Sequence, residues 1–325
     1  MGRRTNLLAS PASLKGVLSA VEAAAALAAG ARDAGVDAVE LPVADGGEGT
    51  AEVLARSLGG QWREAVVADP FGRPVIARYL ILDDGSAVVE SAEAIGLGRL
   101  APDELDPLRA SSAGLGELLA AVLAQGPSSV IVCLGGSATV DGGAGLLGRL
   151  DSWPAGVPLR VACDVRNPLL GERGAARAFG PQKGASPEGM EELEGRLAAM
   201  PALEPYRDLP GAGAAGGLGA ALASLGGSLE PGADLVLDLV GFDAHARAAS
   251  LVVTGEGTVD ESTFEGKAPG TVLARCRTLG VACVLFGGQV TSCYLRGVDV
   301  RVLSGRPEQV REDLAALGKE LALGS

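Results

Sequence analysis

The stretch AVELPVADGGEGTAEVLARSL, residues 38–58, joins a strand-like run to a helix-like run through a loop of glycines and acids. Ala38–Val43 predicts a strand and Gly49–Leu58 predicts a helix, so Asp45 and Glu48 fall just past the carboxyl end of the strand. Open α/β sheets usually bind their ligands at that end of their strands. This stretch therefore predicts an α/β fold with a ligand-binding loop after its second strand.

The same alternation extends outward in both directions. On the N-terminal side it predicts a strand at Asn6–Ser10 and an alanine-rich helix at Ser19–Asp33. On the C-terminal side the predicted elements are strands at Ser250–Thr254, Val281–Phe286 and Val298–Leu303, and helices at Gly270–Leu279 and Glu308–Leu321. Strands that alternate with helices in this way are typical of a parallel sheet.

The middle of the chain has a different texture, which begins near Trp62. Three short strand-like runs separated by turn residues predict an antiparallel meander: Glu64–Ala68, Val75–Leu82 and Ala87–Ser91. After them come a predicted helix at Gly114–Ala124, strands at Ser129–Leu134 and Leu159–Cys163, and a glycine-rich entry to a helix within Leu209–Leu225. We therefore expect two domains: residues 1–60 and 246–325 form a discontinuous parallel α/β domain, and residues 61–245 form an inserted α/β domain.

The composition excludes several classes of protein. The 325 residues are enough for two cores, but the net charge of −13 disfavours nucleic-acid binding, because a phosphate backbone needs a basic surface. No apolar run approaches the ~20 residues of a membrane span, and residues 1–6 do not lead into a secretory segment. The five cysteines form no CxxC pair, and the single histidine, His245, leaves no His-based triad or His-rich zinc site. We expect a cytoplasmic protein with neither nucleic acid nor membrane as its partner.

The use of lysine is the most informative part of the composition. The chain has four lysines against twenty-three arginines, so its general positive charge is carried by arginine. Lys15, Lys183 and Lys267 each lie in a turn rich in Gly, Ser or Pro, whereas Lys319 lies in the C-terminal helical stretch. Phosphate-binding loops use the compact lysine ammonium. Each lysine alone fits an ordinary surface charge equally well, but the three together favour an anion site.

The loop Gly135–Thr139 follows a buried strand and precedes a helix-like run from Gly143. In this geometry backbone N–H groups and a helix N-terminus can hold an anion. The loop has neither the GxxxxGK[ST] nor the GxGxxG pattern, so a plain strand-to-helix turn accounts for it equally well.

Acids recur beside the glycine-rich loops: Asp45, Glu48, Asp141, Asp164, Glu256 and Asp260. Phosphoryl transfer uses Mg²⁺ held by carboxylates and substrate phosphates, cations that neutralise the transferred group, and a carboxylate near the attacking hydroxyl. The chain supplies each of these groups. The plainer interpretation of any one acid is that it forms a turn or caps a helix.

Taken together, these segments resemble the bacterial glycerate kinases. The resemblance runs nearly from end to end and rests on these strings: SLKGVLSA at 13–20, LPVADGGEGT at 41–50, GGSATVDGGAG at 135–145, CDVRNPLLG at 163–171, FGPQKGA at 179–185, LPGAGAAGGLG at 209–219, DLVLDL at 234–239 and VTGEGTVDESTFEGKAPG at 253–270. It implies transfer of the γ-phosphoryl group of ATP to D-glycerate, with Mg²⁺, to give 2-phosphoglycerate or alternatively 3-phosphoglycerate. It also implies two α/β domains, one flavodoxin-like and one like the restriction-endonuclease core with a mixed sheet, and it leaves a homodimer open.

The resemblance also suggests roles for the residues in these strings. The predicted catalytic residues are Lys15, Asp45, Asp164 and Lys267. The predicted substrate- or phosphate-binding residues are Ser13, Gly46, Gly47, Gly135, Gly136, Ser137, Thr139, Lys183 and Gly255. The predicted metal ligands are Asp141, Glu256 and Asp260. Asp164 or Asp45 would accept the hydroxyl proton, and Lys15 and Lys267 would neutralise phosphate or the glycerate carboxylate.

Three departures from the family pattern keep a second interpretation open. Ala12 stands where the family has an acid, Val140 stands where it usually has Asn, and the stretch Leu150–Leu159 is far shorter than in the family. The loss at Ala12 is compatible with a non-catalytic paralogue that binds glycerate or nucleotide as a sensor. An oxidoreductase is disfavoured because GxGxxG and a candidate catalytic His are missing, and a purely structural protein does not call for so many glycine–acid loops.

Overall fold

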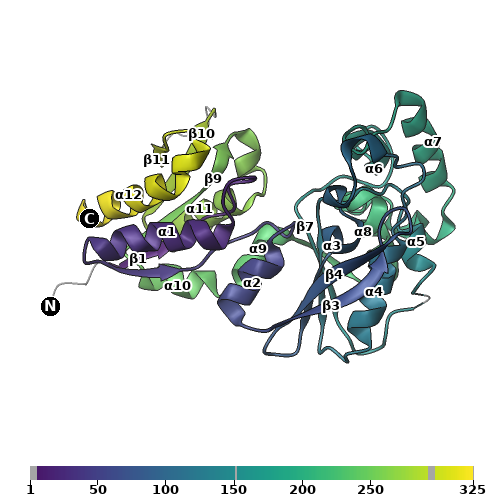
Figure 1. The fold of residues 1–325 in the computed structure, drawn as a ribbon, viewed down its shortest axis with the longest axis horizontal. Coiled ribbons are helices and arrows are strands. Elements are labelled where there is room, and N and C mark those ends of the chain that lie inside the picture. The colour runs from purple at the N-terminus through teal and green to yellow at the C-terminus, as the bar shows by residue number, and fades with distance from the viewer. Residues whose placement is uncertain (1–5, 151, 292–296, 325) are drawn as a thin grey trace. The chain divides into compact units, whose positions relative to one another are not determined.

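A computed structural model describes residues 6–150, 152–291 and 297–324 (Figure 1). Its internal contacts divide the chain into two compact units. The first unit comprises Met1–Asp45, Glu52–Ser57 and Ala233–Ser325, and the second comprises Gly46–Ala51 and Leu58–Gly232. Each unit has its own sheet, which confirms the predicted α/β class.

The first unit contains a five-stranded sheet in which every neighbouring pair is parallel. Its strands are β1 (Asn6–Ala9), β2 (Asp37–Glu40), β9 (Leu251–Val259), β10 (Cys283–Val290) and β11 (Asp299–Val302). Their order across the sheet is β2-β1-β9-β10-β11, which is the 2-1-3-4-5 order of flavodoxin-like folds. The prediction of a flavodoxin-like domain is thereby confirmed, and its switch point lies between β1 and β9.

The helices that belong to this unit are α1 (Ala20–Asp33), α9 (Gly232–Leu239), α10 (Phe242–Ala248), α11 (Ala268–Leu279) and α12 (Val310–Leu323), while α2 (Thr50–Leu58) is shared between the units. Helix α1 begins with a capping box, in which the Ser19 hydroxyl accepts from the Glu22 N–H and the Glu22 carboxylate accepts from the Ser19 N–H. Small residues allow α1 and α12 to pack backbone to backbone. A Cβ at Gly318 would lie 2.1 Å from the Leu27 carbonyl oxygen, so only glycine fits there.

The second unit contains a six-stranded mixed sheet, as predicted. Its strands, in order across the sheet, are β3 (Gln61–Ala68), β4 (Pro74–Ile81), β5 (Ala87–Glu90), β6 (Val130–Leu134), β7 (Leu159–Cys163) and β8 (Ser228–Pro231). Strands β3, β4 and β5 pair antiparallel, and β5 also pairs parallel with β6, so it joins the meander to the parallel half. All five residues of β6 are buried, as expected for a strand covered on both faces.

The helices of the second unit are α3 (Ser91–Ile95), α4 (Ala113–Leu123), α5 (Ala144–Leu147), α6 (Ala175–Phe179), α7 (Pro187–Ala198) and α8 (Ala214–Ser224). The 3₁₀ turns of the two units are η1 (Leu97–Arg99), η2 (Pro102–Glu104), η3 (Pro181–Lys183), η4 (Pro201–Tyr206), η5 (Glu261–Phe264) and η6 (Pro307–Gln309). The helix expected from Gly143 is only the four-residue α5. The glycine-rich start of α8 is not α-helical, because Ala215, Gly216 and Gly217 all have left-handed backbone angles.

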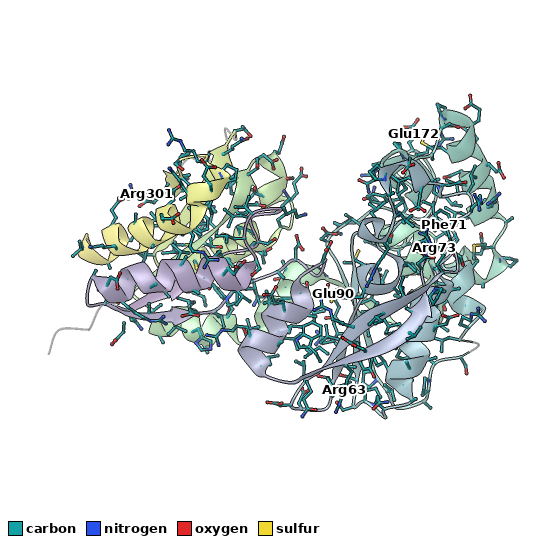
Figure 2. All side chains as sticks on the ribbon, viewed as in Figure 1. Arg63, Phe71, Arg73, Glu90, Glu172 and Arg301 are labelled. Carbon is teal, nitrogen blue, oxygen red and sulfur yellow. The ribbon has the colours of Figure 1, made fainter. Side chains whose placement is uncertain are left out.

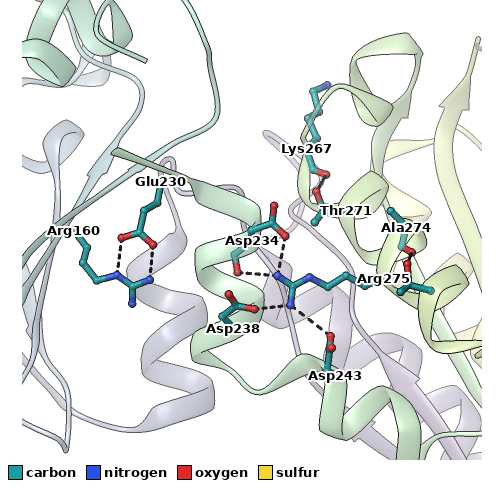
Figure 3. Close-up of polar contacts among 10 residues, drawn as sticks. Arg160, Glu230, Asp234, Asp238, Asp243, Lys267, Thr271, Ala274 and Arg275 are labelled. Atoms are coloured by element: carbon teal, nitrogen blue, oxygen red, sulfur yellow. Dashed lines mark hydrogen bonds and ion pairs between the residues drawn. The ribbon is translucent and has the colours of Figure 1, made fainter. Parts of the chain in front are cut away.

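The contacts divide the chain near residues 45 and 232, whereas the sequence placed the boundaries at 60/61 and 245/246. Ion pairs of Arg275 on α11 explain why α9 and α10 belong to the first unit. Its guanidinium lies 2.8 Å from the Asp234 carboxylate and 2.6 Å from that of Asp238, and 3.5 Å from Asp243 on α10 (Figure 3).

The described residues also bear on membrane spans and on the cysteines. Within the described residues, no helix is both long and apolar enough to cross a membrane. Cys133, Cys163 and Cys276 are free and buried, Cys283 is free and partly exposed, and Cys293 lies outside the described residues.

Candidate active site

In the first unit, the loop that carries Lys15 runs along β9 at the switch point of the sheet. The Ala12 N–H donates to the Gly255 carbonyl (2.9 Å), and the Thr254 hydroxyl donates to the Ser10 carbonyl (2.7 Å). Lys15 itself is exposed and Ser13 is half-buried. A Cβ at Gly255 would come within 2.2 Å of the Phe286 carbonyl oxygen, so glycine is required there for packing against β10.

Beyond this loop, β9 ends in a cluster of two carboxylates and one ammonium. The Lys267 ammonium lies 3.8 Å from the Glu256 carboxylate and 3.9 Å from that of Asp260, and the Lys267 side chain is 33% exposed. The Glu256 carboxylate also accepts from the Thr263 hydroxyl (2.7 Å). Lys267 immediately precedes α11, where its carbonyl accepts from the Thr271 hydroxyl (Figure 3).

The two carboxylates of this cluster differ in their electrostatics. Burial raises the pKa of Glu256, and the Thr263 hydroxyl and the Lys267 charge oppose that rise while the charges of Asp260 and Asp45 add to it. Hydrogen bonding from the Ser262 hydroxyl holds the pKa of Asp260 below its usual range, and Lys267 lowers it further. The cluster therefore combines a partly buried acid, Glu256, and a more exposed carboxylate, Asp260, with one cation.

In the second unit, two glycine-rich loops touch through their backbones. A Cβ at Gly135 would lie 2.9 Å from Gly47 Cα, and one at Gly46 would lie 2.7 Å from Ala162 Cβ at the end of β7. The Ser91 hydroxyl donates to the Gly135 carbonyl (3.1 Å). The loop at residues 46–49 thus crosses the carboxyl ends of β6 and β7, where α/β folds bind ligands.

Glu90 holds the first of these loops in place, and the sequence analysis missed it. Its carboxylate, at the carboxyl end of β5, accepts from the Gly49 N–H (3.2 Å) and the Ala51 N–H (2.7 Å) at the start of α2. The residue is only 8% exposed, and burial raises its pKa against the lowering effect of these bonds (Figure 2). The sequence signal that could have indicated this residue is a glutamate that ends the apolar run AVVE.

The second loop rests on a buried lysine. The Lys183 ammonium donates to the Ser137 hydroxyl oxygen (3.0 Å) and to the Thr139 carbonyl (2.7 Å). Lys183 is 2% exposed, Ser137 3% and Thr139 0%. Burial lowers the pKa of Lys183 to about 7, against the raising effect of the Asp141 charge.

The chain as a whole is similar to known proteins. The sequence model of the Glycerate kinase family matches residues 7–152 and 149–301, which together span most of the chain. The chain belongs to the glycerate kinase family. The two matched stretches overlap at residues 149–152, at the start of the stretch that the sequence analysis expects to be shorter than in the family.

Relatives of this glycerate kinase family member are similar over most of their lengths. A protein of Bacillus subtilis (strain 168) named glycerate kinase is 39% identical, with 90% of this chain and 88% of the relative aligned. A protein of Escherichia coli (strain K12) named glycerate 2-kinase is 40% identical, with 81% of this chain and 80% of the relative aligned. A crystal structure from Salmonella typhimurium LT2, whose name includes glycerate kinase 2, superposes with a TM-score of 0.84 at 33% identity and covers 98% of both chains. The protein is therefore an enzyme of the kinase class.

In this glycerate kinase family member, the Asp141 carboxylate is held by hydrogen bonds from the surrounding protein. It accepts four hydrogen bonds, from the N–H and hydroxyl of Ser112 (both 2.8 Å) and from the N–H groups of Gly143 and Gly145 (both 3.1 Å). These bonds occupy the oxygens predicted to bind metal. Since α5 has only four residues, the anion-binding capacity of this loop rests on its backbone N–H groups and not on a helix dipole.

The remaining predicted residues are distributed over both units. Asp45 is half-buried in the first unit, and Asp164 is exposed directly after β7 in the second. Searched over residues 6–150, 152–291 and 297–324, the structure contains no group of three or more His, Cys, Asp or Glu side chains placed to hold a metal ion. A cavity of about 550 Å³ in the second unit opens beside Gly136 and is lined by Glu48, Glu90 and the ion-paired Arg78, Glu93 and Arg99.

Proposed function

We propose that this cytoplasmic enzyme transfers the γ-phosphoryl group of ATP to D-glycerate and releases 2-phosphoglycerate and ADP. Family membership and the named relatives support the reaction, and the relative named glycerate 2-kinase supports the 2-hydroxyl as acceptor. The observation that carries the assignment to this chain's own residues is the Glu256–Asp260–Lys267 cluster at the end of β9.

Lys267 is the cation best suited to the transferred group. Its contacts to Glu256 and Asp260 are longer than hydrogen bonds, and its side chain remains one-third exposed, so its N–H donors can bind a phosphate oxygen. The exposed Lys15 is the second cation, and we assign it, with Ser13, to the glycerate carboxylate or a phosphate. Asp45 or Asp164 accepts the hydroxyl proton, a modest contribution in a reaction dominated by positioning.

The ATP phosphates are assigned to the backbone N–H groups of the loops at Gly46–Gly47 and Gly135–Gly136. Gly136 is exposed and has a positive φ of 62°, and its carbonyl accepts from the Leu97 N–H (2.7 Å), so this residue would offer a ligand its N–H and not its carbonyl. The Ser137 hydroxyl and the Thr139 carbonyl are both bonded to the buried Lys183 ammonium, so they support this loop from within. Gly255 contributes the close packing of β9 on β10 that fixes Glu256.

Mg²⁺ fits the donor set of the first unit better than that of the second. Glu256 and Asp260 offer hard carboxylate oxygens beside one ammonium, and Mg²⁺ in kinases is held by one or two carboxylates plus substrate phosphates. These two residues would hold the ion, and Asp141 would retain its structural bonds. When bound, Mg²⁺ supplies neutralisation of charge on the transferring phosphoryl group.

The reaction is tested by ADP release from purified full-length protein with ATP, Mg²⁺ and a panel of small hydroxy acids. The proposal predicts the highest kcat/KM with D-glycerate. A higher kcat/KM with lactate, glycolate or L-glycerate would contradict the assignment of the substrate.

One observation favours a second candidate, a non-catalytic sensor of glycerate or nucleotide. Ala12 lies at the base of the Lys15 loop, bonded through its N–H to Gly255, and lacks the acid of the family pattern. Thermal stabilisation by ATP or D-glycerate without ADP release would support this candidate. Ala12→Asp would then be expected to restore measurable turnover.

A further inference from the structure

Lys183 is held rigidly inside the second unit by its backbone as well as by its side chain. It ends the 3₁₀ turn η3, where its N–H donates to the Gly180 carbonyl (3.0 Å). The next residue, Gly184, has φ 95°, and a Cβ there would lie 2.5 Å from the Leu105 carbonyl oxygen. Neither side of Lys183 can shift easily, so the position of its ammonium beneath the Gly135–Thr139 loop is defined by the fold.

The two bonds of this ammonium decide which loop groups remain available to a ligand. An ammonium only donates, so the Ser137 oxygen is the acceptor, and this buried hydroxyl supports the loop from within. The Thr139 carbonyl is turned toward Lys183 and away from any anion, and a Cβ at Gly216 would lie 1.9 Å from the same oxygen. The Gly135 N–H donates to the Ser91 hydroxyl (3.4 Å) and the Ala138 N–H donates to the Ile95 carbonyl (2.8 Å), so an anion would bind to the other N–H groups of the loop.

We propose that Lys183 is a positioning residue for nucleotide binding: its ammonium fixes the Gly135–Thr139 loop from beneath and adds positive charge to it, without touching the phosphates. This inference rests on the proposed function, in which the loop binds ATP phosphates. It changes the role of Lys183 from a direct ligand to a buried charge that acts through Ser137 and Thr139.

The environment of Lys183 makes this charge sensitive to pH. Its immediate partners are the neutral Ser137 hydroxyl and Thr139 carbonyl, and among the described residues Asp141 is the carboxylate whose charge acts on it. Burial lowers the pKa of Lys183 to about 7, so the ammonium is partly deprotonated in the free protein near neutral pH. An anion on the loop favours the charged form and raises this pKa, so binding must take up a proton above about pH 7.

The first test is proton uptake by the wild-type protein, which needs no variant. Binding of Mg-ATP is measured by calorimetry at about pH 8 in buffers of different ionisation enthalpy, where the terminal phosphate of Mg-ATP is already ionised. We expect uptake that approaches one proton per ATP bound, and affinity that falls as the pH rises through about 7. ATP binding with no proton uptake would overturn the proposal.

Variants then assign the proton to Lys183. Lys183→Met keeps the length of the side chain and removes the charge, and we expect it to abolish the uptake and to weaken Mg-ATP binding on the order of tenfold or more. Lys319→Met, the same change on the exposed face of α12, is the control and should bind ATP as the wild type does. Lys183→Met with wild-type affinity and uptake would overturn the proposal.

Two further variants keep the test decisive if Lys183→Met does not fold. Lys183→Arg keeps the charge but cannot lose it, so it should retain ATP binding without the pH dependence. Ser137→Ala removes one acceptor of the ammonium and should weaken ATP binding several-fold while it leaves KM for D-glycerate near wild type. A Ser137→Ala variant that binds ATP as tightly as the wild type would overturn the role of the Lys183–Ser137 bond.

Failure of this inference is distinguishable from failure of the proposed function. A protein that phosphorylates D-glycerate but takes up no proton on binding ATP retains the proposed function and loses the role of Lys183. A protein that does not bind Mg-ATP loses both.

Discussion

Lys267 and Lys183 lie in similar glycine-rich turns but in opposite environments. Lys267, in the first unit, is one-third exposed and lies 3.8 and 3.9 Å from two carboxylates. Lys183, in the second unit, is 2% exposed and bonded at 3.0 and 2.7 Å to two neutral acceptors. In the proposed function, the same residue type in the same kind of turn therefore serves as a reacting cation in one unit and as an internal support in the other.

The partners explain why each arrangement is stable. Two carboxylates compensate the charge of Lys267 at long range and leave its N–H groups available to a ligand. Lys183 is bonded to neutral acceptors, and the Asp141 charge offsets part of the cost of its burial. Burial disfavours the charged ammonium, so the pKa of Lys183 is lowered.

The largest effect is expected at Lys267. Lys267→Met removes the cation assigned to the transferred phosphoryl group, and kcat should fall on the order of 10²–10³-fold, as for loss of one preorganised transition-state donor. Steady-state ADP release is the measurement, with Lys319→Met as the matched control on the surface of α12. Near-wild-type kcat in Lys267→Met would show that this residue does not stabilise the transferred group, and would contradict the contrast drawn with Lys183.

A second prediction concerns glycines that support each region. Gly216 has φ 75° and would place a Cβ 1.9 Å from the Thr139 carbonyl oxygen, whereas a Cβ at Gly257 on β9 meets nothing closer than 3.7 Å. Gly216→Ala should lower the free energy of unfolding by about 3 kcal/mol or more, because it combines backbone strain with a clash. Gly257→Ala should change it by less than about 1 kcal/mol. Chemical denaturation of both variants checks the pair, and equal losses would contradict the packing described here.

The buried lysine also predicts how stability depends on pH. Above about pH 7 the folded state binds fewer protons at Lys183 than the unfolded state does, because the pKa is lowered in the fold. Stability of the ligand-free wild type relative to Lys183→Met should therefore rise, by about 1–3 kcal/mol between about pH 7 and 9. Urea denaturation of both proteins at several pH values measures the difference. A difference that is constant or falls with pH would contradict a buried, partly deprotonated lysine.

The smallest effect is expected at Ala215, which has φ 50° and is the one non-glycine residue of positive φ within the described part of the chain. Ala215→Gly relieves the strain of a left-handed alanine. Glycine also raises the entropy of the unfolded chain, which offsets part of this gain, so the net stabilisation should be about 0.5–1 kcal/mol. A thermal melt with two-state analysis checks it, and destabilisation would indicate that the Ala215 methyl packs usefully.

Much of the fold could be predicted from the sequence because its elements have clear local signals. The Ser19–Glu22 capping box, the buried run of β6 and the turns of the β3–β4 hairpin are local features, and the strands and helices they predict are present. The length of α5 was not predictable, because the Asp141 carboxylate before this helix is also held by the N–H and hydroxyl of Ser112, which lies 29 residues away in the chain.

The site was predicted less completely, since burial depends on residues distant in the chain. The FGPQKGA string gives Lys183 the same local signal as Lys267, yet its ammonium is buried by a loop that lies 44–46 residues away. Glu90 was missed for the same reason. Its partners, Gly49 and Ala51, lie about forty residues upstream, at separations of 41 and 39.

The central claim, transfer of phosphate from ATP to the 2-hydroxyl of D-glycerate, is tested most directly by identification of the product. Purified protein is incubated with D-glycerate, ATP and Mg²⁺ and coupled to enolase and pyruvate kinase without phosphoglycerate mutase. We predict a phosphoenolpyruvate-dependent signal, because enolase accepts 2-phosphoglycerate. A signal that appears only after the mutase is added would place the phosphate on the 3-hydroxyl, and no signal from folded protein with the mutase present would contradict the claim that the chain phosphorylates glycerate.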